Sequence, residues 1–221
     1  MSKFDDYYNI LMEAYMNARI NPNTEKSLRD LAVGAAAENG FIEICAKNGL
    51  LAETATREQE RMHIDYVVTN RNGEPAWKDR PENKAVPPDI VNLVEVKNEK
   101  EGTSGGEFIA EIRNVAGKEG WMYGKAHYLA TFDPNVRGFR MLNREKFKDR
   151  LEKEVDFFVA DQYQGLTHIP LNRVTKKPVE IVRNKTLSKA KMFYMRGQDI
   201  VLYVPYTWVV LSTEFILTNP Q

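Results

Sequence analysis

The sequence predicts an α/β fold with a central mixed β-sheet flanked by helices. Two apolar runs in the middle of the chain, residues 62–69 and 92–98, alternate as strands do, and residues 27–47 before them have helical spacing. Residues 92–132 have the order strand, helix, strand, which predicts a right-handed crossover and a parallel pair of strands. These observations place the core at about residues 27–135.

Length and composition are those of one soluble globular domain. With 221 residues, the chain is most simply a single enlarged domain, with a helical extension at residues 1–24 and a C-terminal helix and strands at residues 136–221. The single cysteine, Cys45, cannot form an internal disulfide, and we expect it to be a small buried residue in a helix. No apolar run approaches the roughly 20 residues that cross a bilayer, and the acidic start lacks the order of a signal peptide. We therefore expect a cytoplasmic protein.

Two helices are expected before the first strand. Apolar residues recur at helical steps over residues 4–18, and a second helix starts near Ser27 and ends at Lys47, with Gly49 as its C-terminal cap. Glu38 lies in the small-residue part of this second helix, where a helix can approach a sheet closely. Two interpretations of Glu38 stay open: a solvent-facing side chain, or an acidic group beside whatever the sheet displays.

The first strand, residues 62–69, has two different faces. One face consists of Met62, Ile64, Tyr66 and Val68, and the other of His63, Asp65 and Val67. A tight turn over residues 70–73 and a polar, proline-rich loop over residues 74–89 follow it. We expect this loop to be an insertion between the two central strands.

The second strand, residues 92–98, carries two charges on one face. Because alternate side chains of a strand share a face, Glu95 and Lys97 point the same way, and Val94 and Val96 point to the other side. Burying an unpaired charge costs several kcal/mol or more, so such charges are paired or bind a metal. The strand therefore predicts a functional site at Glu95 and Lys97.

The remaining elements complete the predicted sheet and its flanking helices. The glycine-rich segment at residues 102–106 is expected to be a loop, and it lacks the GK[ST] ending of a phosphate-binding motif. We expect helices over residues 107–117 and 143–155, and strands over residues 126–132, 200–204 and 208–212.

The arrangement of Asp65 and Glu95-Val96-Lys97 on neighbouring strands resembles the PD-(D/E)xK nuclease superfamily, which has the restriction-endonuclease-like fold. That superfamily often carries an accessory glutamate on the helix before the first active-site strand, and Glu38 matches it. The resemblance covers roughly residues 28–132. Ile64 stands where the superfamily motif has proline. The literal Pro88-Asp89 pair lies only six residues before Glu95, too short to reach a neighbouring strand, so it ranks second to Asp65.

The resemblance implies a metal site and gives each residue a role. Asp65 and Glu95 would hold Mg²⁺, with the Val96 carbonyl as an additional ligand, and Mn²⁺ is expected to substitute for Mg²⁺. Glu38 would complete the ligand set or bind a second ion. Lys97 would hold or help deprotonate the attacking water and counter developing negative charge. These residue types suit phosphodiester hydrolysis, because Mg²⁺ prefers carboxylate oxygens and keeps several waters.

Three further side chains are accessory candidates. His63 shares the strand face of Asp65 and would contact the water or the substrate, although a lone strand histidine is more often structural. Arg113 and Lys125 would contact phosphate near the site or be ordinary surface charges. We expect His127 and His168 to be structural, because they have no partner at ligand spacing.

A basic stretch lies near the C-terminus of a chain whose net charge is zero. The candidates for contact with a nucleic-acid backbone are Arg173, Lys176, Lys177, Arg183, Lys185, Lys189 and Lys191. An equally open interpretation is a solvated surface balanced by acidic patches elsewhere.

The sequence thus predicts a Mg²⁺-dependent nuclease that hydrolyses DNA, most simply an endonuclease. The alternative is a non-catalytic nucleic-acid-binding or assembly protein that keeps a nuclease-like fold. RNA as a substrate and a homodimer as the active form are left open.

Overall fold

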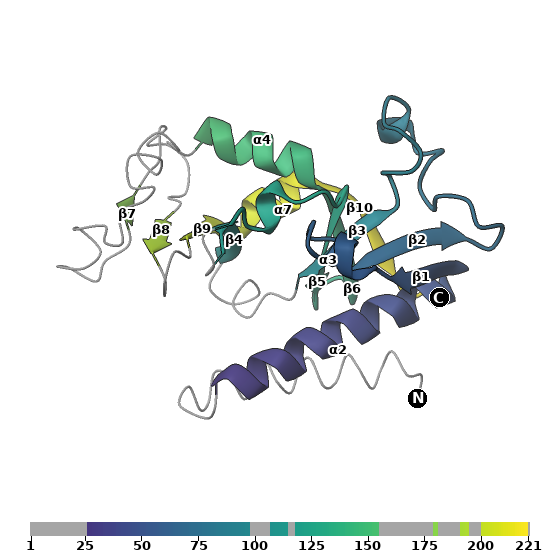
Figure 1. Ribbon diagram of the computed structural model, residues 1–221, viewed down its shortest axis with the longest axis horizontal. Helices are drawn as coiled ribbons and strands as arrows, with labels where there is room; N and C mark the ends of the chain where they lie inside the picture. Colours follow the sequence, from purple (N-terminus) through teal and green to yellow (C-terminus); the bar gives the residue numbers. More distant parts are fainter. Residues whose placement is uncertain are drawn as a thin grey trace.

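A computed structural model of the protein describes residues 26–97, 107–114, 118–154, 179–180, 191–194 and 200–220. It has an α/β fold built on two sheets (Figure 1). The first sheet has the order β1 (Leu50–Thr54), β2 (Tyr66–Asn70), β3 (Leu93–Lys97), β5 (Tyr128–Asp133), β6 (Gly138–Asn143) and β10 (Thr213–Thr218). The second has the order β4 (Glu107–Arg113), β9 (Ile200–Pro205), β8 (Lys191–Tyr194) and β7 (Val179–Glu180).

The first sheet is mixed, as predicted. Strands β3 and β5 run parallel, and the other neighbouring strands of this sheet run antiparallel. The helical elements within the described residues are α2 (Lys26–Lys47), α3 (Arg57–Glu60), α4 (Arg144–Glu154), α7 (Tyr206–Ser212) and the short 3₁₀ turns η1 (Pro81–Asn83) and η2 (Trp121–Tyr123). The α/β fold with a central mixed sheet and helices is therefore confirmed.

Helix α2 is continuous and ends where the sequence predicts. Gly49 adopts a φ of 73°, and its N–H donates to the Ala46 carbonyl at 3.0 Å, so it ends the helix in the left-handed region that favours glycine. Cys45 is fully buried in this helix, as expected. The helix lies along one side of the first sheet in Figure 1 and so brings its small-residue segment against the strands.

The two larger of the three hydrophobic clusters in the described residues hold the fold together. One lies between α2 and the first sheet, and it includes Phe41, Tyr66, Val94 and Tyr128. The other joins the two sheets to α4 and α7, because it contains residues of β4, β5, β6 and β9 together with Phe147 of α4. Residues on both faces of β3 are buried, so the charged Glu95 lies in a largely apolar setting.

The segment at residues 107–113 is a strand, so the helix expected over residues 107–117 is wrong. Phe108 and Ala110 are buried and Ile109 is partly exposed between them, which is the alternation of a strand. Strand β4 pairs with β9, almost a hundred residues later in the chain. The parallel pairing of β3 with β5 is confirmed, but the connection between them includes a strand of the second sheet where we expected a helix.

The strand expected over residues 208–212 is also wrong, because these residues belong to helix α7. Trp208, Val209 and Ser212 are buried, whereas Val210 and Leu211 are exposed, which is a helical and not an alternating pattern. The helix follows directly after Pro205, whose fixed φ suits a helix start. The last strand, β10, comes after the helix.

Several smaller predictions can be compared with the structure. The strands expected at residues 126–132 and 200–204 and the helix at 143–155 are confirmed by β5, β9 and α4 within two residues at each end. The insertion at residues 74–89 contains no strand of either sheet, but its Trp77 and Asn83 are buried. The helix over residues 4–18 and the loop at 102–106 lie outside the described residues. No described helix is long and apolar enough to cross a membrane.

Candidate active site

The candidate site forms beside β2 and β3, at the point where a hydrogen bond to a side chain replaces the backbone pairing of the two strands. The N–H of Asp65, the residue before β2, donates to the Val94 carbonyl at 2.8 Å. One step further along β3, the N–H of Val96 donates to the Asp65 carboxylate at 2.7 Å. The carbonyl of Val96 faces the same flank, because the N–H and C=O of a strand residue point the same way. The Asp65 carboxylate and the Val96 carbonyl therefore lie on the same flank of β3.

Glu95 and Lys97 point to one face of β3 and form an ion pair, which confirms that they share a face. The Glu95 side chain is only 4% exposed, so its charge is taken almost completely out of water. Its Oε1 receives the Lys97 ammonium, but its Oε2 is buried without a hydrogen-bond partner among the described residues. A buried carboxylate oxygen without a donor is costly, and it is an open position for a cation.

Glu38 reaches the site from α2. The Tyr66 hydroxyl donates to Glu38 Oε2 at 3.4 Å, so the helix does place this carboxylate beside the first residue of β2. Although much of the Glu38 side chain is exposed, partial burial of its carboxylate and the nearby charge of Asp65 raise its pKa. The structure thus favours the second interpretation of Glu38, an acidic group beside the sheet.

The carboxylates of the site repel one another. Burial first, and then the charge of Glu95, raise the pKa of Asp65 to about 6, in spite of the Lys97 ammonium and the Val96 hydrogen bond. Burial disfavours the charged form of Lys97, but the charges of Glu95 and Asp65 outweigh it and raise the pKa of this ammonium. The ion pair with Glu95 therefore favours the protonated form of Lys97.

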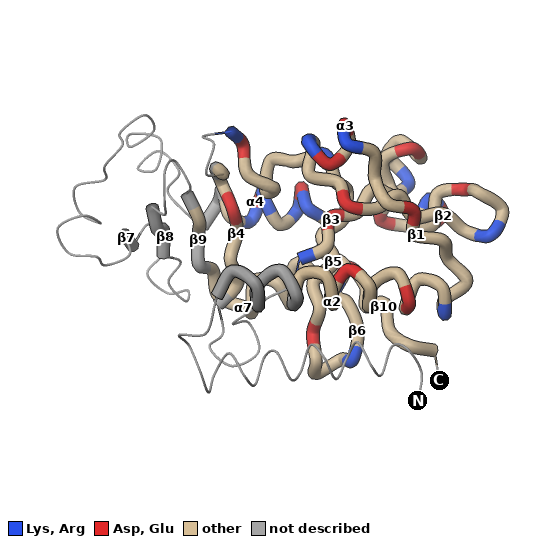
Figure 2. The backbone as a smooth tube through the Cα atoms, turned by 60° about the horizontal axis from the view of Figure 1, so that its bottom comes forward, with Lys and Arg blue, Asp and Glu red and all other residues tan. Residues whose placement is uncertain are grey.

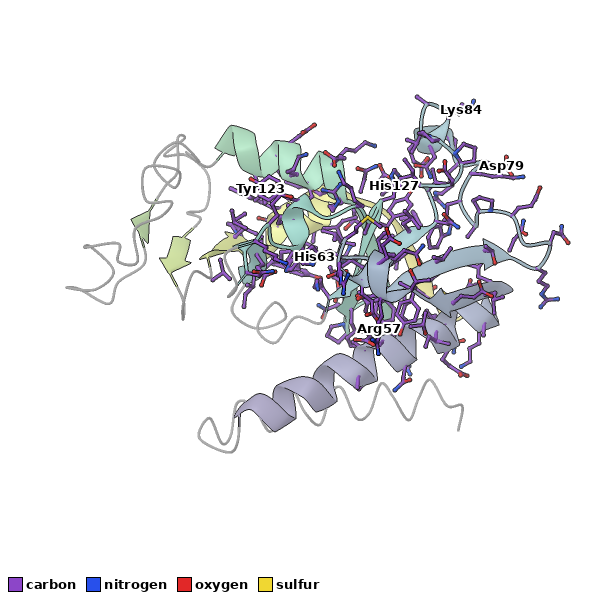
Figure 3. The ribbon with its side chains drawn as sticks, in the orientation of Figure 1. Arg57, His63, Asp79, Lys84, Tyr123 and His127 are labelled. Carbon is purple, nitrogen blue, oxygen red and sulfur yellow. The ribbon has the colours of Figure 1, made fainter. Side chains whose placement is uncertain are left out.

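His63 does not lie on a strand, so the expected start of the first strand at Met62 is wrong. Residues 61–63 form a turn after α3, and the alternation begins at Ile64. Nevertheless the His63 ring, labelled in Figure 3, reaches the site. Its Nδ1 lies 4.0 Å from Glu95 Oε1, and its Nε2 lies 3.1 Å from the Glu119 carbonyl.

The other predicted residues are not brought to these carboxylates by any described contact. Lys125 is exposed, and its described contact is a backbone hydrogen bond to Met62. Asp89 is exposed in the insertion, which agrees with its second rank. His127 is buried against Asn83, as a structural histidine would be.

Several predicted residues have no described side chain. The backbone of Arg113 ends β4 and that of Lys191 begins β8, but their side chains are outside the description. The rest of the basic stretch, and His168, lie outside the described residues.

Glu111 and Trp121 are neighbours of the site that sequence reasoning missed. The charge of Glu111 contributes to the raised pKa of Lys97, and the Glu111 carboxylate accepts a hydrogen bond from the backbone N–H of Trp121 at 3.3 Å. The Lys97 ammonium lies 5.5 Å from the centre of the Trp121 ring, within reach of a cation–π contact. Glu111 was missed because residues 107–113 were expected to form a helix, and only their pairing with β9 reveals the strand that carries Glu111. In Figure 2, acidic and basic positions lie close together around β3 and α3.

The donor set fits Mg²⁺ better than a metal that needs a closed protein cage. Among the described residues, no group of three or more His, Cys, Asp or Glu side chains is placed to hold a metal ion. Mg²⁺ commonly takes one or two carboxylates and completes its shell with water and substrate phosphate. Asp65 and Glu95, whose Oε2 is open, satisfy that smaller requirement.

Comparison of the chain with models of known protein families, with curated proteins and with solved structures gives no match. The geometry of the site is therefore what supports a function.

Proposed function

We propose that this protein is a Mg²⁺-dependent nuclease that hydrolyses DNA phosphodiester bonds as an endonuclease of the PD-(D/E)xK type. The observation that carries the proposal is Glu95, a buried carboxylate on the strand that also bonds Asp65. One of its oxygens is paired to Lys97, and the other has no donor among the described residues. Acidic groups held close together at a cost in stability are characteristic of catalytic sites.

Asp65 and Glu95 would hold the ion, with the Val96 carbonyl on the same flank. When bound, Mg²⁺ supplies Lewis-acid stabilisation and a more acidic water at neutral pH. Lys97 stays charged beside Glu95, so it can neutralise negative charge that develops on the phosphoryl oxygens. Glu38, held by Tyr66, extends the negative region from the side of α2.

The test is cleavage of DNA of different forms by the purified protein. Plasmid, linear duplex, single-stranded and branched DNA, and RNA, are incubated with Mg²⁺, with Mn²⁺ or with EDTA. We expect metal-dependent cutting, and opening of the circular plasmid would establish endonuclease activity. Glu95→Gln, purified in parallel, guards against a contaminating nuclease, and Glu53→Gln, on an exposed carboxylate of β1, is the matched control.

Two outcomes would contradict the proposal. Cleavage that persists in EDTA or in Glu95→Gln would remove the metal site from the mechanism. Binding of nucleic acid without cleavage of any substrate would support the alternative, a non-catalytic binding or assembly protein on a nuclease-like fold.

A further inference from the structure

His63 occupies a backbone position that favours glycine. The N–H of His63 donates to the Glu60 carbonyl at 3.0 Å, and the N–H of Ile64 donates to the Gln59 carbonyl at 3.2 Å. This pair of bonds is the Schellman motif that ends a helix, and His63 is its left-handed residue, with a φ of 57°. A side chain with a β-carbon costs free energy in this conformation, and histidine is tolerated there far less readily than glycine.

The surrounding structure makes room for the His63 side chain. A β-carbon added to Gly124 would lie 2.6 Å from the His63 β-carbon, closer than two such atoms can approach. Gly124 has a φ of −63°, which any residue adopts, so its lack of a side chain matters here for space and not for backbone freedom. Gly124 therefore leaves room for a β-carbon at position 63 and for the Met62 carbonyl beside it.

The imidazole is oriented toward Glu95. A carbonyl oxygen can only accept, so Nε2 is the donor in its contact with the Glu119 carbonyl, and in the neutral form of the ring the lone pair is then on Nδ1. That Nδ1 lies 4.0 Å from Glu95 Oε1. Two acceptors at this separation do not bond to each other, but they converge on a single donor placed between them.

We propose that His63 is a positioning residue that acts with Glu95. His63 Nδ1 and Glu95 Oε1 together accept hydrogen bonds from the water that attacks the phosphodiester, and so aim its lone pair at the phosphorus. This role deepens the proposed nuclease function and rests on it. Strain that persists in a folded protein is often located at functional sites, and a role in the site explains why the chain keeps histidine where glycine would be more stable.

The decisive variant is His63→Gly, because it removes the imidazole and relieves the backbone at the same time. We expect it to unfold at the same temperature as the native protein or at a higher one. Its single-turnover cleavage rate should fall by about tenfold or more, as misplacement of a reacting group does, with the Kd for DNA nearly unchanged. The native side chain is 24% exposed, so added imidazole can reach the position left by the ring and should restore part of the rate.

Arg137→Gly is the matched control. Arg137 is also a non-glycine residue with positive φ, 47°, but it lies in the turn between β5 and β6. Its replacement by glycine should relieve the same kind of backbone strain and leave the cleavage rate unchanged.

Three outcomes would overturn the role of His63. A His63→Gly protein that unfolds several degrees below the native protein would mean that the ring serves folding through Glu119. Native turnover in His63→Gly would mean that the ring does not position the water. A native protein that cleaves no substrate would refute the nuclease function itself. This outcome can be told apart from the other two, because they are measured against an active native enzyme.

Discussion

Two buried carboxylates on adjacent strands of the first sheet, Asp133 and Glu95, differ in the donors that their oxygens have. Asp133, at the end of β5, accepts the Arg140 Nε at 2.6 Å with one oxygen and the Asn135 N–H at 2.8 Å with the other. Glu95, on β3, pairs one oxygen with Lys97 and leaves the other buried without a described donor. Both carboxylates are almost completely out of water.

The difference separates a structural charge from a candidate catalytic one. A buried carboxylate whose oxygens all have donors contributes to a defined fold, and removing one partner leaves an uncompensated charge. A carboxylate with an open oxygen, crowded by Asp65, gains little stability from its burial. Its retention is explained by a ligand that binds there, and this gives opposite expectations for substitutions at the two residues.

The largest effect is expected on catalysis at Glu95. Glu95→Gln should lower the single-turnover cleavage rate on the order of a thousandfold, because it removes the charge that holds the metal. Asp65→Ala and Lys97→Ala should be similarly inactive. Urea unfolding of Glu95→Gln should stay within about 1 kcal/mol of the native protein, since relief of repulsion with Asp65 offsets the lost ion pair. A fully active Glu95→Gln protein would show that Glu95, like Asp133, has a structural role and no catalytic one.

The next effect is on stability at Asp133. Asp133→Asn should lower the free energy of unfolding by about 3 kcal/mol, because Arg140 loses its buried partner. The cleavage rate per folded molecule should be unchanged. Urea denaturation followed by tryptophan fluorescence, with activity measured on the folded fraction, tests both statements, and a stable Asp133→Asn protein would contradict the structural assignment.

A smaller effect should appear in the dependence of stability on pH. The folded state raises the pKa of Asp65 to about 6 from its ordinary value of 3.8, so the folded state binds this proton more tightly than the unfolded state. The resulting stability is fully present below pH 3.8 and is lost as pH rises through 6. Asp65→Asn should therefore equal the native protein near pH 4 and exceed its stability by on the order of 2 kcal/mol at pH 7 in the absence of metal. A difference of the opposite sign would show that Asp65 is stabilised when ionised.

The smallest effect concerns the basic stretch of residues 173–191. If Lys176 and Lys177 contact a phosphate backbone, replacing both with alanine should weaken binding equally for all sequences and reduce the salt slope by about one per lost contact. Single-turnover cleavage at saturating DNA should be nearly unchanged. Binding isotherms at several salt concentrations measure the slope, and a slope identical to that of the native protein would assign these lysines to a solvated surface.

The charged face of β3 could be predicted because it depends on local geometry. Glu95 and Lys97 are two residues apart on one strand, and the alternation of a strand fixes their common face whatever the rest of the chain does. Asp65 followed from the same rule, since the alternation from Ile64 to Val68 is present in the structure. The end of α2 at Gly49 was also predictable, because a glycine cap is a local signal.

The parts that could not be predicted depend on distant pairing. Residues 107–113 have apolar positions compatible with a helix, and the choice of strand is set by β9, which no local pattern reveals. The continuous apolar run in α7 suits a strand equally well until its two exposed residues are known. The close approach of Gly124 to the β-carbon of His63 likewise arises only in the folded chain.

Because the Val96 N–H donates to the Asp65 carboxylate, this backbone amide is a spectroscopic probe of the site. An amide that donates to an ionised carboxylate has a stronger bond than one that donates to a neutral acid, and its proton resonance moves downfield accordingly. In a two-dimensional NMR spectrum the Val96 peak should thus shift with a midpoint near pH 6, the pKa of Asp65. Divalent ions that bind to the same carboxylate should shift this peak at constant pH. A single resonance would then record both the charge of Asp65 and the occupancy of its oxygens, without any substrate.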